Sequence, residues 1–555
     1  MKRLLQVPSI AWGALTALCV ALVVLYPAWL SPTEVLVGHE SLDVWSHAWG
    51  QHWFVTQLSS FDLPWHTTGA SWPEDRVLWY IDPIGALLSA PLQLFGAAVA
   101  WNGLVFLEVF ALSLAGWLWG RSLGGRGYLA AMALGSLPML QGELHNGVSE
   151  AVWIAPVALG AWLAAKGSRW CGVAVGVAAV MTPYHGIPAA LLAGTLMLMG
   201  GAKGERAWKT RAVDCALAAG LTLALALPHI LLISESVSSP LTFVNRALWT
   251  GFNEPVLLSN AVDPIALVHP GDFWSVPSLD NVLGSPWRRT PYLGLGLLIL
   301  APIGIARSPR LAWLLLPFSV IVVATCGLFL WHDGGWVTDA NGWRYQLPLG
   351  MLVEATGLGL DHPMRFAASA SVLLAGLADR GVGKLSLPLG VVLLIEHLAL
   401  APNSWPVTTC PAELPAVYEH IPDNDLAVID LPADSGVAMR TDRYLYWEAL
   451  HGHPVPWNNK VGTMGTASMN PTLRTWVLLS KTDRPQPGTP GVPDANADLE
   501  AALDQLVDAG LGYVIVHPEL LAKDHLLQTH RKKISELLGP PEEVEGALVW
   551  RVRRN

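Results

Sequence analysis

The feature that most constrains the fold is a long apolar run near the start of the chain. From about residue 7 to residue 30 no side chain is charged, and roughly 20 consecutive apolar residues suffice to cross the hydrocarbon core of a bilayer. Lys2 and Arg3 precede the run, which favours a cytoplasmic N-terminus. No small-x-small cleavage motif follows "YPAWLSP", so we interpret the run as a membrane anchor rather than a signal peptide.

The rest of the chain extends this pattern. Hydrophobic residues make up 52% of the sequence and charged residues 14%, whereas soluble domains are about a quarter charged. We therefore predict a polytopic α-helical membrane protein with about eleven transmembrane helices. The further apolar runs lie near residues 100–120, 127–141, 150–165, 169–184, 186–200, 211–233, 291–306, 310–331, 363–380 and 384–401.

The basic residues give the predicted helices a consistent orientation. Every second short connection contains Lys or Arg and falls on the same side as the N-terminus, as the positive-inside rule requires. The first opposite connection is acidic. One short run, about Pro83 to Leu94, is interrupted by Pro91, and we expect it to lie along the membrane instead of crossing it. All 17 histidines fall in outer loops, the outer halves of spans or the C-terminal region; the shortness of the inner loops explains this equally well.

The chain divides into two predicted domains. Residues 1–401 form the transmembrane part, with outer loops at about 31–82, 234–290 and 332–362. From residue 402 the composition becomes that of a soluble protein, and the topology places this part outside. Strands at "DLAVIDLP", "GYVIVHP" and "EGALVWRV" alternate with helices at "DLEAALDQLVDAGL" and "HLLQTHRKKISELLG". Residues 402–555 therefore predict a C-terminal extracytoplasmic α/β domain.

Two classes of protein are disfavoured by the remaining composition. The five cysteines are scattered, mostly in or beside apolar runs, and indicate neither a disulfide framework nor a cysteine-based metal site. The net charge is −10 and no exposed basic face is visible, so nucleic acid is not an expected partner.

A polar stretch directly after the first apolar run is the strongest candidate for chemistry. It reads "HESLDVWSHAWGQHWF" and covers residues 39–54. On a helix, Trp45, Trp49 and Trp53 share one face, while His39, Asp43 and His47 form a stripe on another. We expect an amphipathic helix at the outer membrane interface, with the tryptophans toward the lipid or the bundle and the polar stripe toward an aqueous cavity.

This stripe allows three interpretations. A carboxylate at the edge of a bilayer serves as a general base when partial desolvation raises its pKa, a role that suits Asp43 with Glu40 assisting. Alternatively, Asp43 with His39 and His47 holds a divalent cation such as Mg²⁺ or Mn²⁺. The third interpretation is a solvated helix face with no chemistry.

The order of these features resembles the GT-C superfamily of integral membrane glycosyltransferases. Asp43 stands where that family's acidic residue of the first outer loop stands. Four further segments are similar to family features: "YIDPIGALLSAPLQLFG" (80–96), "GELHNGVSEAVWIAPVALGAW" (142–162), "DHPMRF" (361–366) and "LAVIDLP" (426–432). In the "DHPMRF" segment Asp361 replaces the first arginine of the family's R-x-P-x-R-F motif, and neither a paired-carboxylate dyad nor a W-W-D motif is present.

The resemblance implies transfer of a sugar from a polyprenyl-phosphate donor to a glycan, lipid or protein acceptor on the outer face of a bacterial inner membrane. Arg365 is the expected ligand of the donor phosphate because a guanidinium matches phosphate oxygens; His362 is expected to assist. An Arg that reaches for lipid head groups is the alternative. Other residues are expected to line the cavity, although polar turns and satisfied core histidines explain them too: His39, His47, His145, Asn146, Glu150, Tyr184 and His185. Arg246, Arg288 and Arg289 are weaker candidates for the phosphate.

The prediction is thus a GT-C-like glycosyltransferase with Asp43 as base or metal ligand. The alternative is a non-catalytic protein of the same architecture that acts as a lipid-linked glycan carrier, flippase or assembly scaffold. A flippase needs a polar path through the bundle, and few charged residues lie inside the apolar runs to form one.

Overall fold

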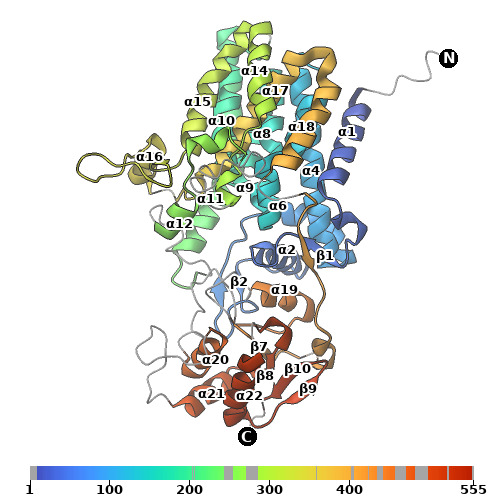
Figure 1. The fold of residues 1–555 in the computed structure, drawn as a ribbon, viewed down its shortest axis with the longest axis vertical. Coiled ribbons are helices and arrows are strands. Elements are labelled where there is room, and N and C mark those ends of the chain that lie inside the picture. Colours follow the sequence, from blue (N-terminus) through green and yellow to red (C-terminus); the bar gives the residue numbers. More distant parts are fainter. Residues whose placement is uncertain are drawn as a thin grey trace, which may run out of the picture. The chain divides into compact units, whose positions relative to one another are not determined.

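Two compact units make up the chain (Figure 1). The helical unit comprises Met1–Pro32, Asn102–Leu232 and Arg246–Thr409, and the mixed unit comprises Thr33–Trp101, Ile233–Asn245 and Cys410–Asn555. The computed structural model describes residues 9–202, 204, 207–242, 254–270, 286–357, 359–401, 405–422, 424–433, 442–456, 470–481, 498–521 and 524–552.

The helical unit is built from apolar helices joined by short connections. Each of the eleven predicted apolar runs coincides with one or two helices. In chain order these are α1 (Ser9–Val24), α4 (Ala97–Ser122), α5 (Tyr128–Gly135), α6 (Pro138–Asn146), α7 (Ser149–Val152), α8 (Ala155–Ala165), α9 (Cys171–Met181), α10 (Pro183–Leu198), α11 (Trp208–Ser238), α14 (Leu295–Arg307), α15 (Leu315–Thr325), α17 (Phe366–Val382) and α18 (Ser386–Leu400). Between them lie α12 (Glu254–Ser259), β4 (Trp331–His332), β5 (Gly335–Trp336), α16 (Pro348–Thr356) and the short 3₁₀ segments η4 (Pro264–Leu267), η6 (Pro286–Arg289), η7 (Pro309–Leu314) and η8 (Pro363–Arg365).

Three helical stretches among the described residues are long and apolar enough to cross a membrane, judged by length and composition: Ala97–Ser122, Trp208–Ser238 and Pro363–Leu400. The last stretch holds two of the predicted runs, because the backbone breaks at Gly383, where φ is +57°, and α17 and α18 are separate helices. Several shorter apolar helices accompany them, including Ile10–Val24 and Pro309–Thr325. The number of about eleven spans therefore stays a prediction.

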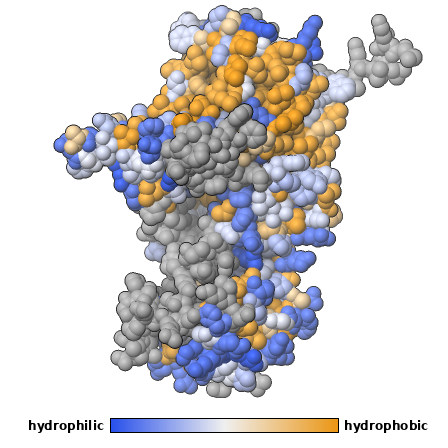
Figure 2. Space-filling model, in the orientation of Figure 1, coloured by the Kyte–Doolittle hydropathy of each residue, from blue (hydrophilic) through white to orange (hydrophobic). Residues whose placement is uncertain are grey.

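The surface of the helical unit is strongly apolar. Large hydrophobic side chains are exposed along α11, α14, α15 and α18, among them Leu223 (61%), Ile299 (66%), Leu316 (62%) and Ile395 (59%). Figure 2 shows hydrophobic residues gathered over the helices of this unit. Soluble proteins rarely expose contiguous apolar patches of this kind, whereas a bilayer covers them. We therefore treat the helical unit as embedded in a membrane.

The centre of the helical unit is α17, whose sequence "FAASASVLLAGLADRGV" is rich in small residues. It packs against α5, α14 and α15. At Gly304 of α14 the two backbones lie so close that a Cβ would collide with the carbonyl oxygen of Leu377. Small residues allow such close approach, which drives helix association in lipid. Almost every residue of α17 is buried as a result.

The mixed unit contains a four-stranded sheet with the order β7-β8-β10-β9. Strand β7 (Ala427–Leu431) is parallel to β8 (Leu511–Val516), and β10 (Ala547–Arg551) is antiparallel to both β8 and β9 (Glu542–Val544). Helices α19 (Asp442–His451), α20 (Pro471–Lys481), α21 (Leu499–Asp508) and α22 (Asp524–Leu538) accompany the sheet. The unit also includes the segment from residue 33 to residue 101, with β1 (Val35–Val37), α2 (Val44–Ser59), β2 (His66–Thr67), β3 (Arg76–Val77), α3 (Pro83–Ser89) and η2 (Ala90–Phe95), together with β6 (Thr409–Pro411), which pairs with β1.

The strands and helices that the sequence predicted after residue 402 are confirmed. Both buried strands, β7 and β8, are fully buried. Asp498 caps α21, since its side chain accepts a hydrogen bond from the Ala501 N–H at 3.0 Å. Gly539 ends α22 in the left-handed conformation. The boundary at residue 402 remains a prediction, because the compact unit that holds this sheet also holds residues 33–101 and 233–245.

The predicted helix over residues 39–54 begins later than expected. Helix α2 starts at Val44, and residues 39–43 form turns before it. The three tryptophans are nearly fully buried rather than lipid-facing (Trp45 1%, Trp49 2%, Trp53 7% exposed). They pack inside the mixed unit: Trp45 lies 5.6 Å from the Tyr446 ring of α19, and Trp49 stacks on Trp53. The alternative that the tryptophans face the lipid is therefore wrong, and the interfacial position of the helix stays a prediction.

A buried arginine–carboxylate pair as candidate site

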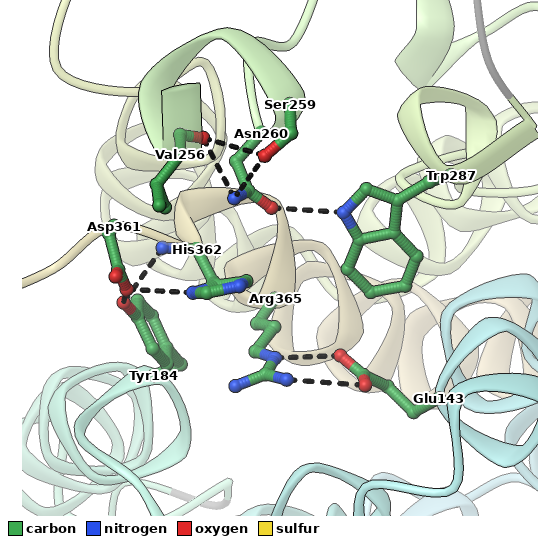
Figure 3. Close-up of polar contacts among 9 residues, drawn as sticks. All are labelled: Glu143, Tyr184, Val256, Ser259, Asn260, Trp287, Asp361, His362 and Arg365. Atoms are coloured by element: carbon green, nitrogen blue, oxygen red, sulfur yellow. Dashed lines mark hydrogen bonds and ion pairs between the residues drawn. The ribbon is translucent and has the colours of Figure 1, made fainter. Parts of the chain in front are cut away.

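Arg365 lies at the start of the central helix α17 and is only 8% exposed. The η8 turn brings it there, because Pro363 is restricted to the first positions of a helical turn. Its guanidinium donates two hydrogen bonds to Glu143 of α6, from Nε to Oε1 at 2.7 Å and from Nη2 to Oε2 at 3.3 Å (Figure 3). The carboxylate of Glu143 is fully buried. This fork-to-fork geometry is the strong form of an ion pair and fixes the plane of the guanidinium.

The third guanidinium nitrogen, Nη1, is left over. It makes no hydrogen bond with any residue that the structure describes, and Figure 3 shows it turned away from Glu143. Glu150 is a second negative charge in the electrostatic environment of Arg365. The ring of Tyr184 lies under the guanidinium, 5.8 Å from its carbon. Arg365 is thus held by Glu143 and by the Tyr184 ring, and its Nη1 has no hydrogen-bond acceptor among the described residues.

A second polar group adjoins this edge. His362 donates from Nδ1 to Asp361 at 2.7 Å, and Tyr184 donates its hydroxyl proton to the same carboxylate at 3.1 Å. The His362 backbone N–H donates to the Tyr184 hydroxyl at 2.8 Å. Burial alone would raise the pKa of Asp361, but the hydrogen bonds from His362 and Tyr184 and the charge of Arg365 lower it. Asp361 is therefore ionised, and it orients His362 so that Nε2 remains available.

Segments of the second predicted outer loop pack above this group. The Trp287 indole donates to Asn260 at 2.9 Å, and Asn260 in turn donates to the Val256 carbonyl at 2.9 Å (Figure 3). Thr290 contacts Met364, the residue before Arg365, at 3.6 Å. A Cβ at Gly142 of α6 would lie 2.5 Å from the Thr290 side chain, so a glycine is needed for this close packing. The loop therefore fixes both η8 and the helix that carries Glu143.

The structure brings together some of the predicted cavity residues. Arg365, His362, Tyr184 and Glu150 lie in one polar cluster. His185 is buried and bonds through Nε2 to the Ala151 carbonyl at 2.8 Å.

His145, by contrast, lies apart from this cluster. It bonds to Thr408 at 2.9 Å and lines a small cleft whose other residues are Val24, Gln141, Leu144, Trp405 and Val407. Asn146 ends α6 and is half-buried. Of the weaker arginine candidates, Arg288 bonds to the Leu258 carbonyl and stacks on Trp331, while Arg246 lies outside the described residues.

Four predicted residues belong to the mixed unit. Asp43 immediately precedes α2, is half-buried, and its carboxylate makes no hydrogen bond or ion pair with a described residue. Glu40 is exposed and forms an ion pair with Arg443 of α19 at 2.8 Å. The His39 ring accepts the Ser41 N–H at 3.1 Å. His47 is only 2% exposed and thus does not face an aqueous cavity. The prediction that His39, Asp43 and His47 form a stripe on one helix is wrong, because α2 begins only at Val44.

The metal ion proposed for Asp43, His39 and His47 stays a prediction. Among the described residues, no group of three His, Cys, Asp or Glu side chains is arranged to hold a metal. Asp43 and His39 precede α2, whereas His47 is buried one turn inside it. A divalent cation needs several converging oxygen or nitrogen ligands. No step of the chemistry is therefore assigned to a metal.

Sequence reasoning missed Glu143. A signal for it was present, because a carboxylate inside an apolar stretch is expensive and marks a partner or a function. The segment "PMLQGELHN" places Glu143 among buried residues at the end of a predicted span. The partner was out of reach, since Arg365 follows 222 residues later. Asp361 was noticed only as a departure from the family motif, and its role in orienting His362 emerges from the fold.

Comparison with known proteins gives matches only among solved structures; no family model and no curated protein matches the chain. An oligosaccharyltransferase from Archaeoglobus fulgidus is 12% identical, with a TM-score of 0.43 over 91% of this chain and 69% of its own. Arabinofuranosyltransferase AftD from Mycobacteria is 14% identical, with a TM-score of 0.45 over 94% of this chain and 38% of its own. ArnT from Cupriavidus metallidurans, in a structure with bound undecaprenyl phosphate, is 14% identical, with a TM-score of 0.38 over 98% and 97%.

These matched proteins are GT-C glycosyltransferases, the superfamily that the sequence resembles. The chain spans well under half of the AftD structure. At these identities and TM-scores, the function of this chain has to rest on its own side chains.

Proposed function

We propose that this protein is a membrane glycosyltransferase that moves a sugar from a polyprenyl-phosphate donor to an acceptor hydroxyl. The observation that carries the proposal is the Arg365 guanidinium, held by buried Glu143 with its Nη1 edge left open beside His362. Burial of a charged side chain at the end of a membrane helix costs free energy and is typical of functional residues. With Nη1 unpaired among the described residues, Arg365 points to a second anionic partner besides Glu143. A lipid phosphate is the anion that reaches such a position from within a bilayer.

The open edge suits a phosphate group. Arg365 Nη1 donates to one phosphate oxygen, and His362, which Asp361 holds through Nδ1, lies beside it. Glu143 balances the arginine charge, so the site is not strongly cationic when it is empty. These groups stabilise the negative charge that grows on the phosphate as the sugar departs, and donors fixed in advance are the most effective source of such stabilisation.

The transfer itself is a single displacement. The acceptor oxygen forms a bond to the anomeric carbon of the sugar while the bond from that carbon to the phosphate oxygen breaks. The polyprenyl phosphate leaves with the bonding electron pair. Asp43, whose carboxylate has no described partner, accepts the proton of the acceptor hydroxyl as general base. The proposal assigns Glu40 a supporting role through its charge alone, because its carboxylate is paired with Arg443.

Donor turnover by the purified protein in lipid nanodiscs tests the proposal. The panel consists of polyprenyl-phosphate hexoses and pentoses, and release of polyprenyl phosphate is measured. We expect wild type to consume at least one donor, Asp43→Asn to abolish turnover, and Arg365→Lys to reduce it strongly because a lysine lacks the fork. The control is Asp62→Asn, an exposed acid of the same predicted loop as Asp43, which should retain wild-type turnover.

The outcomes separate the candidate functions. Turnover that survives Asp43→Asn would remove Asp43 from the mechanism while leaving the glycosyltransferase in place. Donor binding without turnover in wild type would favour the alternative of a non-catalytic carrier, flippase or scaffold. If wild type neither bound nor consumed any donor of the panel, this result would contradict the assignment of Arg365 to a lipid phosphate.

A further inference from the structure

A compact arm, residues 328–357, projects from the helical unit between α15 and η8. It consists of the β4–β5 hairpin, a third extended segment and α16. In Figure 1 the arm extends sideways, away from the bundle helices. Hydrogen bonds hold its three extended segments together, from Leu330 N to Tyr345 O at 2.9 Å, from Val337 N to Leu330 O at 2.9 Å and from Tyr345 N to Val337 O at 3.0 Å.

An ion pair and aromatic rings hold the arm together. Arg344 forms a two-point ion pair with Glu254 of α12 at 2.8 and 2.9 Å. Its guanidinium also stacks on the rings of Phe329 and Trp336, 5.8 and 5.0 Å away. The pairing with Arg344 lowers the pKa of Glu254. Arg344 therefore points inward, and because side chains alternate along an extended strand, Trp343 and Tyr345 point outward.

The outward side chains are large and apolar. Trp343 is 75% exposed and Tyr345 52%, and on α16 Met351 and Leu352 are 56% and 44% exposed. An exposed apolar surface of this kind indicates a partner. Tryptophan and tyrosine are the residues enriched where a membrane meets water, since their rings are apolar and their edges form hydrogen bonds. Figure 2 shows hydrophilic and hydrophobic residues mixed on the arm, in contrast to the uniformly apolar bundle.

Continuity with the lipid-facing bundle identifies the partner. Helix α16 packs against α15, and α15 exposes Leu315, Leu316, Val320 and Val323 to the surroundings of the bundle. Only Cys326 and Gly327 separate α15 from the arm. A segment that leaves a membrane helix at its end and extends sideways lies along the bilayer surface. We propose that the arm docks on the bilayer through Trp343, Tyr345, Met351 and Leu352, with the lipid head-group region as its partner.

Docking also fixes the depth of the candidate site. The chain leaves α16 at Gly357, which is left-handed at φ +68°, and reaches Asp361 and His362 within a few residues. An arm held at the head groups keeps these residues near the level at which a lipid phosphate lies. The docking proposal itself does not depend on the glycosyltransferase activity, because it rests on the arm's own surface.

Spin labels on the full-length protein in nanodiscs of phosphatidylethanolamine and phosphatidylglycerol test the proposal. Cys19 and Cys215 are replaced by Ser, since the remaining cysteines are buried. Labels are placed singly by Trp343→Cys and Met351→Cys. Val320→Cys on α15 serves as the lipid reference, and Asp508→Cys, on the exposed face of α21, as the aqueous reference. Collision rates with oxygen, which concentrates in lipid, and with a water-soluble nickel chelate are compared.

We expect both arm labels to show the oxygen preference of the Val320 label. Labels that instead show the nickel preference of the Asp508 label would overturn the proposal. Labels shielded from both reagents would overturn it as well, in favour of a protein partner. Because all the substituted arm residues are highly exposed, these variants leave the packing of the fold unchanged.

Discussion

The Arg365–Glu143 pair is the most constrained group of residues in the helical unit. About a tenth of the Arg365 side chain is exposed and none of Glu143, so neither charge has water to replace its partner. A buried ion pair contributes little net stability, yet losing one member leaves an uncompensated charge. Because apolar residues would stabilise the fold equally well, the presence of this pair indicates a function rather than a contribution to stability.

Variants of Glu143 and Arg365 should affect stability non-additively. Glu143→Gln should lower the free energy of unfolding by about 3–5 kcal/mol, because it leaves the Arg365 charge buried and unpaired. The double variant Glu143→Gln with Arg365→Gln should regain part of that loss, since no charge remains. Thermal unfolding in detergent micelles measures both. Strictly additive losses would show that the two residues do not act as a pair.

Phe61 shows the opposite situation, since its backbone is strained and its side chain packs against no residue that the structure describes. It ends α2 with φ of +61° and a side chain that is 99% exposed. Hydrogen bonds from Asp62 N to Gln57 O at 2.9 Å and from Phe61 N to Leu58 O at 3.1 Å form a Schellman motif, whose left-handed position usually holds glycine.

Replacing Phe61 by Gly should therefore stabilise the protein. A left-handed conformation costs a residue with a Cβ roughly 1–2 kcal/mol, part of which the extra freedom of glycine in the unfolded chain offsets. We expect Phe61→Gly to raise the unfolding temperature slightly, and Phe61→Ala to leave it nearly unchanged. A lower unfolding temperature for Phe61→Gly would mean that the phenyl ring has a partner in the folded protein.

At the level of elements, the position of α16 depends on one close contact. A Cβ at Gly350 would collide with the carbonyl oxygen of Leu328, the first residue of the arm. This contact is what seats the helix on the extended segments, with Leu349 and Val353 buried beside it. The geometry of the arm is thus set by the absence of a side chain.

Gly350→Ala should consequently loosen α16. Overpacking of this kind typically costs about 1–3 kcal/mol, and we expect faster proteolytic cleavage within residues 328–357. Gly335→Ala is the matched control in the same arm, because nothing lies within 4 Å of its added Cβ. Equal cleavage rates for the two variants would show that α16 tolerates the displacement.

The mixed unit carries titratable groups that couple its folding to pH. Burial by itself would lower the pKa of His517, but hydrogen bonds with Asp430 at 3.0 Å and with Glu519 outweigh it and raise the pKa. Burial raises the pKa of Glu448 from 4.5 to about 7, which the hydrogen bond from the Trp49 indole offsets only in part. Both groups bind protons more tightly when the unit is folded.

The sign of the pH dependence follows. Protonation of Glu448 stabilises the folded unit below its unfolded pKa, and that stability is lost between about pH 4.5 and 7. The His517 contribution is complete below about 6.5, the ordinary histidine value, and is lost as the pH rises through its raised pKa. We expect the unfolding temperature of the mixed unit to fall from pH 5.5 to pH 8.5. Glu448→Gln should flatten the lower part of this profile and His517→Gln the upper part; profiles parallel to wild type would contradict the assignment.

The class of the protein was predictable from local features of the chain. Uncharged runs long enough for a bilayer and the placement of Lys and Arg are local properties of the chain, so they indicated a membrane protein without any knowledge of packing. The strands and helices after residue 402 were predictable for the same reason, since hydrophobic periodicity and caps such as Asp498 act within a few residues.

Tertiary structure alone decided the partners of the candidate site. Arg365 was predictable as a cation at the mouth of a span, but Glu143 joins it from a helix 222 residues away, and no local pattern encodes that distance. The same holds for α2. Its tryptophan face was visible in the sequence, but only the tertiary structure shows that α19 rather than lipid covers that face. Apolar faces do not specify their partners, because hydrophobic attraction has no direction.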